Sequence, residues 1–594
     1  MIFLFKFIGR RRIAFFLGGL LLLSISDLVG IAIIFPYLKI ISEPVLIQSK
    51  SSLSIVYSML GFQNNGQFVY ALSACMLLFF TLKSGMTFLL TRYQFKELAE
   101  LGHRLTTLLF GMLMRARYDF FLKQSPSELV GMNYTYSSQV VFCFQAWLGI
   151  LNELIFFFLF LGISAYLQPL ATVIVFAIMA VVAGLLYLLI IKRIMSYGKE
   201  QSRIDGDRYR WTFATVSSIK DAKIMSLGNI FTDRTVALSA LTKEISWRNS
   251  LASSLPRVSI EYVIMSCFVI VAVLFVRSGV GVEKMIPVLG LMALAALRVL
   301  PAFGRLTGLY GSFKYSKNYL DKLAEFHDGL QQNQQDIKHT ALPFAKQIEI
   351  NDLSFKYGES VILDALSMTI KKGQSIGIVG SSGSGKSTLL DVITGLQEKA
   401  SGQFHLDGVE IDPYDTDALK KYIGYVPQQI AVIDESIAFN IAFSHDYDEE
   451  KIHRVIRTAN LEEYISGLPH GIRTSVGEAG ARLSGGQKQR LGIARALYRD
   501  PEILIFDEST SALDNITEKE LSDEIARLAG SKTLIIVAHR LTTIMKCDVI
   551  YVLERGHIVA QGSHAELLAT CGLYQTMNMQ SDEGVELESA DGRT

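Results

Sequence analysis

A glycine-rich stretch, residues 380–387, carries the clearest chemical signal in the sequence. It reads Gly-Ser-Ser-Gly-Ser-Gly-Lys-Ser and fits the phosphate-cradling pattern G-x-x-x-x-G-K-[ST]. Residues 375–379 before it are typical of a buried strand, and residues 388–393 after it are typical of a helix. In that context free backbone N–H groups and the helix dipole converge on an anion. The stretch therefore predicts a nucleoside triphosphate site rather than a Gly/Ser turn beside a surface lysine.

The residue types in this loop have separate tasks in phosphate binding. Gly383 and Gly385 would let the backbone wrap closely around the ligand, Lys386 would reach the β- and γ-phosphates, and the Ser387 hydroxyl would bind Mg²⁺. We expect ATP and Mg²⁺ as ligands. The positions assigned to nucleotide binding in the loop are Gly380, Ser381, Gly383, Ser384, Gly385, Lys386, Ser387 and Thr388.

Two carboxylates at the end of a later apolar segment would supply the rest of the magnesium site and the base. Residues 504–508 read as a buried strand that ends in Asp507 and Glu508. Asp507 would hold Mg²⁺, directly or through water, and Glu508 would polarise the attacking water as general base. Two acids after a strand are also compatible with a solvated turn, but a phosphate loop upstream favours the catalytic interpretation.

Three further positions complete the expected ATP site. His539 follows another buried strand and would sense the γ-phosphate, although a lone histidine is usually structural. Gln428, which follows Tyr425-Val426-Pro427, would contact Mg²⁺ and the attacking water. Tyr357 would stack on adenine.

Composition points to a large membrane protein. The chain has 594 residues, of which 50% are hydrophobic, and its mean hydropathy is +0.32. The net charge of +1 gives no field that favours nucleic acid, so we expect no nucleic-acid partner. The five cysteines are scattered without a C-x-x-C pair, which indicates neither a disulfide framework nor a zinc site. No small-residue cleavage site follows the first apolar run, so we interpret it as a retained membrane helix.

Six apolar segments in the N-terminal half are long enough to span a bilayer, which takes about 20 residues each. A single segment of this kind fits a buried soluble helix equally well, but six in one half of a chain do not. The predicted spans are residues 13–38, 68–90, 140–167, 170–191, 258–276 and 285–303.

Lysine and arginine placement sets the expected orientation. These residues gather at 6–12, 92–123 and 192–210, which by the positive-inside rule lie in the cytoplasm, as do both termini. Within the two long cytoplasmic connections, residues 118–128 and 215–223 read as short crossing segments. They would dock on a nucleotide domain or simply form helical hairpin turns. In an outer connection, residues 51–62 fit a short helix on the membrane surface or packed on the protein.

The predicted organisation is an α-helical six-span membrane domain followed by an α/β P-loop ATPase domain. The last membrane helix should continue to about residue 326, and a polar run rich in glutamine marks a linker. The acidic C-terminal end lacks apolar periodicity and should be disordered. The expected boundaries are 1–330 for the membrane domain, 331–346 for the linker, 347–580 for the nucleotide-binding domain and 581–594 for the tail.

A further motif, Leu-Ser-Gly-Gly-Gln at 483–487, narrows the class of ATPase. With it, residues 347–579 resemble the ATP-binding cassette (ABC) family, in which two cassettes sandwich two ATP molecules head to tail. The resemblance implies that Ser484, Gly486 and Gln487 of one copy face the γ-phosphate held by Lys386 of the other. One chain carries one cassette, so a dimer is needed. Two equal sites favour a C₂ homodimer, and a different partner chain stays open.

The order of the two domains resembles the fused exporters of this family. It implies an ATP-driven exporter or flippase that works by alternating access in a bacterial inner membrane. Two other classes stay open: a soluble cassette ATPase, which the membrane segments oppose, and an ATP-gated channel or regulator. Residues 26–30, 218–223 and 297–301 resemble bacterial flippases of lipid-linked oligosaccharides. Lipid A-like glycolipids, drugs and peptides are the alternative substrates.

A lipid-linked pyrophosphate would need cations on the cavity wall, because an unpaired phosphate in a low-dielectric site is very unfavourable. Arg298, helped by Lys83 and Arg305, is the candidate set. The alternative is that such cations pair with membrane carboxylates and only hold helices together. The carboxylates available are Asp27, Glu153 and Glu261.

Overall fold

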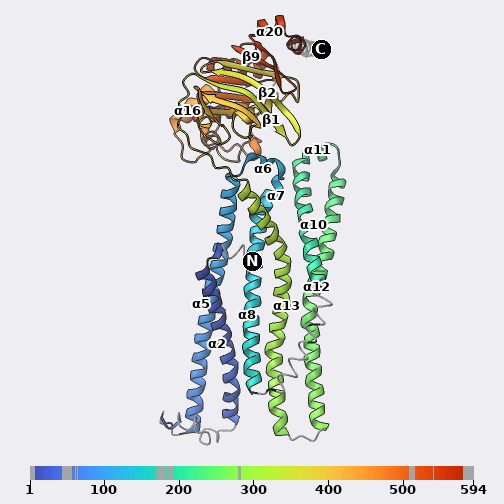
Figure 1. Cartoon of the computed structure of the whole chain (residues 1–594). Helices are drawn as coiled ribbons and strands as arrows, with labels where there is room; N and C mark the ends of the chain where they lie inside the picture. Colours follow the sequence, from blue (N-terminus) through green and yellow to red (C-terminus); the bar gives the residue numbers. More distant parts are fainter. Residues whose placement is uncertain are drawn as a thin grey trace. The chain divides into compact units, whose positions relative to one another are not determined.

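The computed structural model describes residues 7–42, 57–59, 62, 64–167, 169, 181, 184, 192–277, 282–507, 515–538 and 541–579. The chain divides into two compact units (Figure 1). A helical unit comprises Met1–Ala116 and Phe120–Gln334, and a nucleotide-binding unit comprises Arg117–Asp119 and Gln335–Thr594.

Long helices build the helical unit. Five of the six predicted spans fall inside them, and of the fourth, 170–191, only residues 181 and 184 are described. Within the described ranges, three stretches are long and apolar enough to cross a membrane: Arg10–Gly30, Asn65–Met114 and Pro126–Tyr166. The long helices are α2 (Arg10–Ser42), α5 (Asn65–Met114), α8 (Ser137–Leu167), α10 (Lys192–Ser217), α12 (Gly228–Arg277) and α13 (Val282–Gln332).

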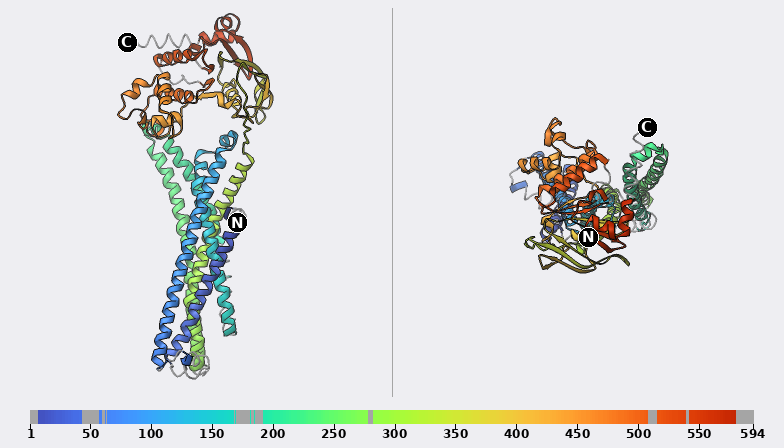
Figure 2. Two further views of the ribbon diagram at one scale, coloured as in Figure 1. Left: turned by 90° about the vertical axis from the view of Figure 1, so that its left-hand side faces the viewer. Right: turned by 90° about the horizontal axis from the view of Figure 1, so that it is seen from above.

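Several of these helices are much longer than a bilayer requires. Helix α5 has 50 residues, which corresponds to about 75 Å at 1.5 Å per residue, whereas the hydrocarbon core is about 30 Å thick. The Asn64 side chain caps its start by accepting from the N–H of Gly66 at 3.1 Å. Helices α2, α5, α8 and α13 share one apolar core, and α10 lies beside α12 (Figures 1 and 2). Helix α5 is therefore long enough to continue well beyond a bilayer.

The two predicted crossing segments form short helices. The first contains α6 (Tyr118–Lys123) and the start of α7 (Pro126–Gly131), because the Ser125 hydroxyl caps α7 and Pro126 suits its first turn. The second contains most of α11 (Ile219–Ile224). A π-helical turn, η1 (Met132–Tyr136), joins α7 to α8. Of the expected surface helix at 51–62, only residues 57–59, which are helical, and 62 are described.

The nucleotide-binding unit contains two β-sheets. One is antiparallel, in the order β2-β1-β4-β5. The other has the order β10-β9-β3-β8-β7-β6 and is parallel except for the edge strand β10. The strands are β1 (Gln347–Tyr357), β2 (Ser360–Lys371), β3 (Ser375–Gly380), β4 (Ser401–Leu406), β5 (Val409–Ile411), β6 (Ile423–Val426), β7 (Ile503–Asp507), β8 (Thr533–Val537), β9 (Val549–Glu554) and β10 (His557–Gly562).

Two apolar cores pack on the faces of the parallel sheet, so its central strands are buried almost throughout. The α-helices of this unit are α14 (Lys386–Ile393), α15 (Ile437–Ala442), α16 (Glu449–Thr458), α17 (Glu462–Ser466), α18 (Gly485–Tyr498), α19 (Asn515–Leu528) and α20 (His564–Thr570). Short 3₁₀ turns are η3 (Lys420–Tyr422), η4 (Gly471–Arg473), η5 (Glu478–Gly480) and η6 (Leu541–Thr543).

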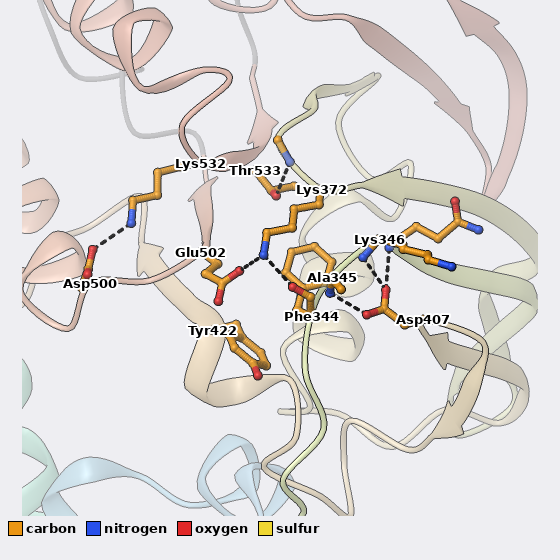
Figure 3. A network of polar contacts seen from close by, with 12 residues as sticks. Phe344, Ala345, Lys346, Lys372, Asp407, Tyr422, Asp500, Glu502, Lys532 and Thr533 are labelled. Atoms are coloured by element: carbon orange, nitrogen blue, oxygen red, sulfur yellow. Dashed lines mark hydrogen bonds and ion pairs between the residues drawn. The ribbon is translucent and has the colours of Figure 1, made fainter.

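The segment that leads into β1 is held by side chains of the nucleotide-binding unit (Figure 3). The Asp407 carboxylate accepts from the backbone N–H groups of Ala345, Lys346 and Gln347 at 2.5, 2.7 and 2.8 Å. Burial works to raise the pKa of Asp407, but these three donors outweigh it and hold the pKa below its ordinary value. The end of the predicted linker is therefore clamped to this unit.

Candidate nucleotide-binding site

The glycine-rich loop connects β3 to α14, as the pattern predicts. Gly383 and Gly385 have φ angles of +80° and +103°, in the left-handed region that favours glycine. At Gly385 a Cβ would also lie 2.8 Å from the Leu363 side chain. At Gly380 a Cβ would overlap the Leu553 carbonyl and the Ser384 hydroxyl. The loop conformation therefore depends on glycine at these positions.

Lysine and serine side chains of the loop are arranged for an anion. Lys386 is only 5% exposed, and its Nζ donates to the carbonyls of Gly380 at 2.9 Å and Ser381 at 3.2 Å. Ser384 is 2% exposed, and within the described residues its Oγ has no hydrogen-bond partner. An unsatisfied buried hydroxyl costs about 1–3 kcal/mol, and a phosphate oxygen would remove that cost. The first turn of α14 contains Ser387, which is exposed, and Thr388.

Parallel pairing brings the remaining ATP-site positions to the same edge of the sheet. In register, Ile378 of β3 and Asp507 of β7 both pair with Val537 of β8, and Val426 of β6 pairs with Phe506. The carboxyl edge of the sheet therefore carries the loop after β3 and Asp507 at the end of β7. The segment after β6, which contains the exposed Gln428, starts at the same edge.

Glu508 and His539 lie outside the described residues. They directly follow Asp507 and Ala538, which are described. Their roles as general base and γ-phosphate sensor stay predictions.

Sequence reasoning did not assign a role to two residues beside Asp507. The Tyr425 hydroxyl donates to Asp507 Oδ2 at 2.8 Å. Burial and the Asp507 carboxylate raise the pKa of Tyr425, so the phenol stays protonated and donates. Asp391 of α14 is the second residue: burial and Asp507 raise its pKa to about 6. The i, i+4 spacing from Ser387 to Asp391 was a usable signal, because it puts both on one face of α14.

Tyr357 ends β1 and is 44% exposed. Its ring lies edge-on to Phe355 with centroids 4.8 Å apart. Burial of part of the side chain raises the pKa of its phenol. An exposed ring held by a second aromatic is available for stacking on a base, and the adenine contact stays a prediction.

The Leu-Ser-Gly-Gly-Gln motif at 483–487 lies at the start of a 14-residue helix, α18. The Ser484 hydroxyl accepts from the N–H of Gln487 at 3.2 Å, and Gln487 Oε1 accepts from the N–H of Ser484 at 2.9 Å. This reciprocal capping box satisfies two N–H groups, and Gly486 in the first turn keeps the helix start unobstructed. The remaining N–H groups and the helix dipole suit an anion such as a γ-phosphate.

Two of the three candidate substrate cations are paired inside the helical unit. Lys83 Nζ of α5 lies 2.6 Å from Asp27 Oδ1 of α2. Arg305 of α13 donates to Glu153 of α8 through Nε at 2.6 Å and Nη2 at 3.2 Å. Glu153 is 8% exposed. The side chain of Arg298 lies outside the described residues. The alternative interpretation, in which such cations tie helices together, therefore fits Lys83 and Arg305.

The helical unit also contains a cavity of about 720 Å³ between α7, η1, α10 and α13. Arg203 and Arg210 of α10 line it together with Glu128, Asp321 and Glu325 from the other helices. Tyr136 and Tyr209 add to the lining.

Comparisons with known proteins agree with this geometry. Residues 363–511 match the family described as ABC transporter. An ATP-dependent lipid A-core flippase of Pseudomonas aeruginosa is 43% identical over 236 residues, 39% of each chain. The heterocyst differentiation ATP-binding protein HepA of a Nostoc species is 38% identical over 285 residues, 47% of this chain and 46% of that protein. The matched stretch thus spans less than half the length of these relatives.

A solved structure titled as a bacterial Atm1-family ABC exporter with ATP bound has the same fold. It superimposes with a TM-score of 0.75 at 22% identity and covers 96% of this chain and 99% of that one. The coverage includes the helical and the nucleotide-binding unit. The side-chain geometry, the sequence profile and the fold together fit ATP with Mg²⁺ at the carboxyl edge of the parallel sheet.

Proposed function

Because this chain has the fold of an ABC exporter, with a fused membrane domain and a nucleotide-binding domain of the ABC transporter family, we propose that it is an ATP-driven exporter of an amphipathic lipid. The observation that carries the proposal is the phosphate loop between β3 and α14, with Lys386 buried in it and Asp507 at the same sheet edge. The membrane is the bacterial inner membrane, and both termini lie in the cytoplasm.

Each ATP-site residue then has a defined task. The loop N–H groups and Lys386 bind the β- and γ-phosphates, while Ser387, Gln428 and Asp507 hold Mg²⁺. The ion neutralises charge that develops on the phosphates. Glu508 orients the attacking water and accepts its proton.

A second copy completes the site. Ser484 and the α18 N-terminus of one chain face the γ-phosphate bound by the other, so ATP joins two nucleotide-binding domains. Closing them turns the membrane cavity outward, and hydrolysis with product release resets it. We propose a homodimer, because one chain carries all motifs of one competent cassette.

The substrate we propose is a glycolipid with an anionic head group, and specifically a lipid-linked oligosaccharide. The sequence features at 26–30, 218–223 and 297–301 support that choice. Since Lys83 and Arg305 are paired, Arg298 is the principal candidate for attracting the pyrophosphate. A lipid A-type glycolipid is the second candidate, because the name of the Pseudomonas aeruginosa relative supports it.

The test uses the purified chain in liposomes, with flipping and ATPase activity measured together. A polyprenyl-pyrophosphate oligosaccharide and a lipid A-core glycolipid are supplied in parallel. ATP-dependent flipping of the first, lost in Arg298→Ala with ATPase activity retained, is the expected result. Arg248→Ala is the matched control, because Arg248 is an exposed arginine of α12 paired with Glu244. Flipping of the lipid A-core glycolipid alone would replace the oligosaccharide, and ATP-gated ion flux without flipping would favour a channel.

A further inference from the structure

The hydrogen bond between Tyr425 and Asp507 gives the expected Mg²⁺ carboxylate a fixed orientation. Tyr425 stands on β6 and Asp507 ends β7. The phenol donates to Oδ2 at 2.8 Å, which leaves Oδ1 as the carboxylate oxygen without a hydrogen bond from this donor. Mg²⁺ requires near-ideal octahedral geometry, so a carboxylate that rotates freely is a poorer ligand than one held in place.

The contact is not needed to join the two strands. Residues Ile423–Val426 of β6 already pair with Ile503–Phe506 of β7 through a continuous backbone ladder, in which Tyr425 lies opposite Ile505. Apolar packing of Val426 and Phe506 in the sheet core adds to that pairing. The side-chain bond therefore acts on the carboxylate, and strand pairing does not depend on it.

A second carboxylate, Asp391, is electrostatically coupled to Asp507. Asp391 lies on the same face of α14 as Ser387, and the Asp507 carboxylate contributes to the raised pKa of Asp391. Without the phenol, Asp507 Oδ2 would lose its donor, and the carboxylate would turn to regain water or another donor.

We propose that Tyr425 is a positioning residue for Mg²⁺, which holds Asp507 so that one defined oxygen faces the ion or its bound water. This inference rests on the proposed ATPase function and adds a residue to it. Tyr425 would act on the ion through its hydrogen bond to Asp507. Removal of partners that orient metal ligands typically lowers metal affinity by about 10–100-fold.

The experiment compares full-length Tyr425→Phe with the unmodified protein in lipid nanodiscs. We expect the half-saturating Mg²⁺ concentration for ATP hydrolysis to rise by about 10–100-fold, with kcat at saturating Mg²⁺ largely retained. A readout independent of turnover is Mn²⁺ binding in the presence of ATP, measured by electron paramagnetic resonance in the Glu508→Gln background. Nucleotide binding without a divalent ion should stay unchanged.

A matched control removes another phenol hydroxyl from the same sheet. Tyr551 of β9 exchanges hydrogen bonds with the backbone of Thr369, with its hydroxyl donating to the carbonyl at 3.0 Å, so Tyr551→Phe should leave the Mg²⁺ dependence unchanged. Tyr425→Leu also lacks the hydroxyl donor, so it should raise the half-saturating Mg²⁺ concentration in the same way. It serves as a second variant if Tyr425→Phe folds poorly.

The inference would be overturned if Tyr425→Phe or Tyr425→Leu had the same Mg²⁺ dependence and Mn²⁺ affinity as the unmodified protein. It would also be overturned if Tyr551→Phe raised the half-saturating Mg²⁺ concentration as much as Tyr425→Phe does. Failure of the proposed function looks different, because the unmodified chain itself would then show no Mg²⁺-dependent ATP binding. That result would remove the inference together with the function it rests on.

Discussion

Ser484 has two separable roles in this account, and substitutions at one position distinguish them. Within the chain its hydroxyl caps α18, and in the proposed dimer it would face a γ-phosphate. Ser484→Ala loses the cap, which costs about 1 kcal/mol. In a domain of this size that lowers Tm by about 2–4 °C.

Ser484→Asp keeps a good N-cap but places a carboxylate toward the phosphate. Two unit charges 4 Å apart interact by about 4 kcal/mol at an effective dielectric constant near 20. This corresponds to a loss of about 10³-fold in the affinity of the closed, ATP-joined dimer, at about 1.4 kcal/mol per tenfold. We therefore expect Ser484→Asp to match the unmodified chain in Tm, to bind ATP at Lys386, and to lose nearly all hydrolysis.

The assay is ATPase turnover in nanodiscs, with thermal unfolding of the same samples. Mixed dimers sharpen it. With Ser484→Asp in one chain and Lys386→Ala in the other, both lesions fall on one site and the second site stays intact. With both changes in one chain, each site carries one lesion. Near-normal turnover by Ser484→Asp, or equal turnover by the two arrangements where one intact site is known to turn over, would refute the head-to-tail arrangement.

Three other predictions concern single contacts. Glu508→Gln should retain ATP binding and lose turnover by about 10²–10⁴-fold; near-normal hydrolysis would remove Glu508 from the base role. Lys83→Met should lower thermal stability by leaving Asp27 without its ammonium, and Lys83→Met combined with Asp27→Leu should restore it; full stability of the single variant would contradict structural pairing. Asp407→Ala should destabilise the nucleotide-binding unit by about 2 kcal/mol at pH 7. Because the pKa of Asp407 is lowered in the folded chain, this difference is full above the ordinary carboxyl pKa and shrinks as the pH falls through the lowered value; a difference independent of pH would exclude a role for the ionised carboxylate.

Local sequence was enough to predict the phosphate loop and its flanking elements. Glycine at positive φ and an apolar run before it are local properties, so β3 and α14 begin and end within a few residues of the expected positions. Ser125 followed by Pro126 was likewise a local capping signal, although the segment 118–128 was predicted without a break. The glutamines that suggested a linker extend α13 to Gln332, because glutamine is a good helix former.

Contacts between distant segments could not be predicted in this way. The bond from Tyr425 to Asp507 joins residues 82 positions apart and depends on the register of β6 with β7. The pairing of Lys83 with Asp27 depends on how α2 and α5 align, where Gly30 leaves room for the lysine: a Cβ there would lie 3.2 Å from Nζ. No periodicity in either helix specifies that alignment.

ATP-dependent movement of a glycolipid between leaflets is the most direct measurement of the central claim. Liposomes carrying the unmodified chain and a labelled polyprenyl-pyrophosphate oligosaccharide should lose label from the leaflet that faces the nucleotide-binding domains when Mg²⁺ and ATP are added. Liposomes carrying Glu508→Gln should keep it. Equal rates for the two proteins, or no ATP-dependent movement of any glycolipid by the unmodified chain, would contradict the account.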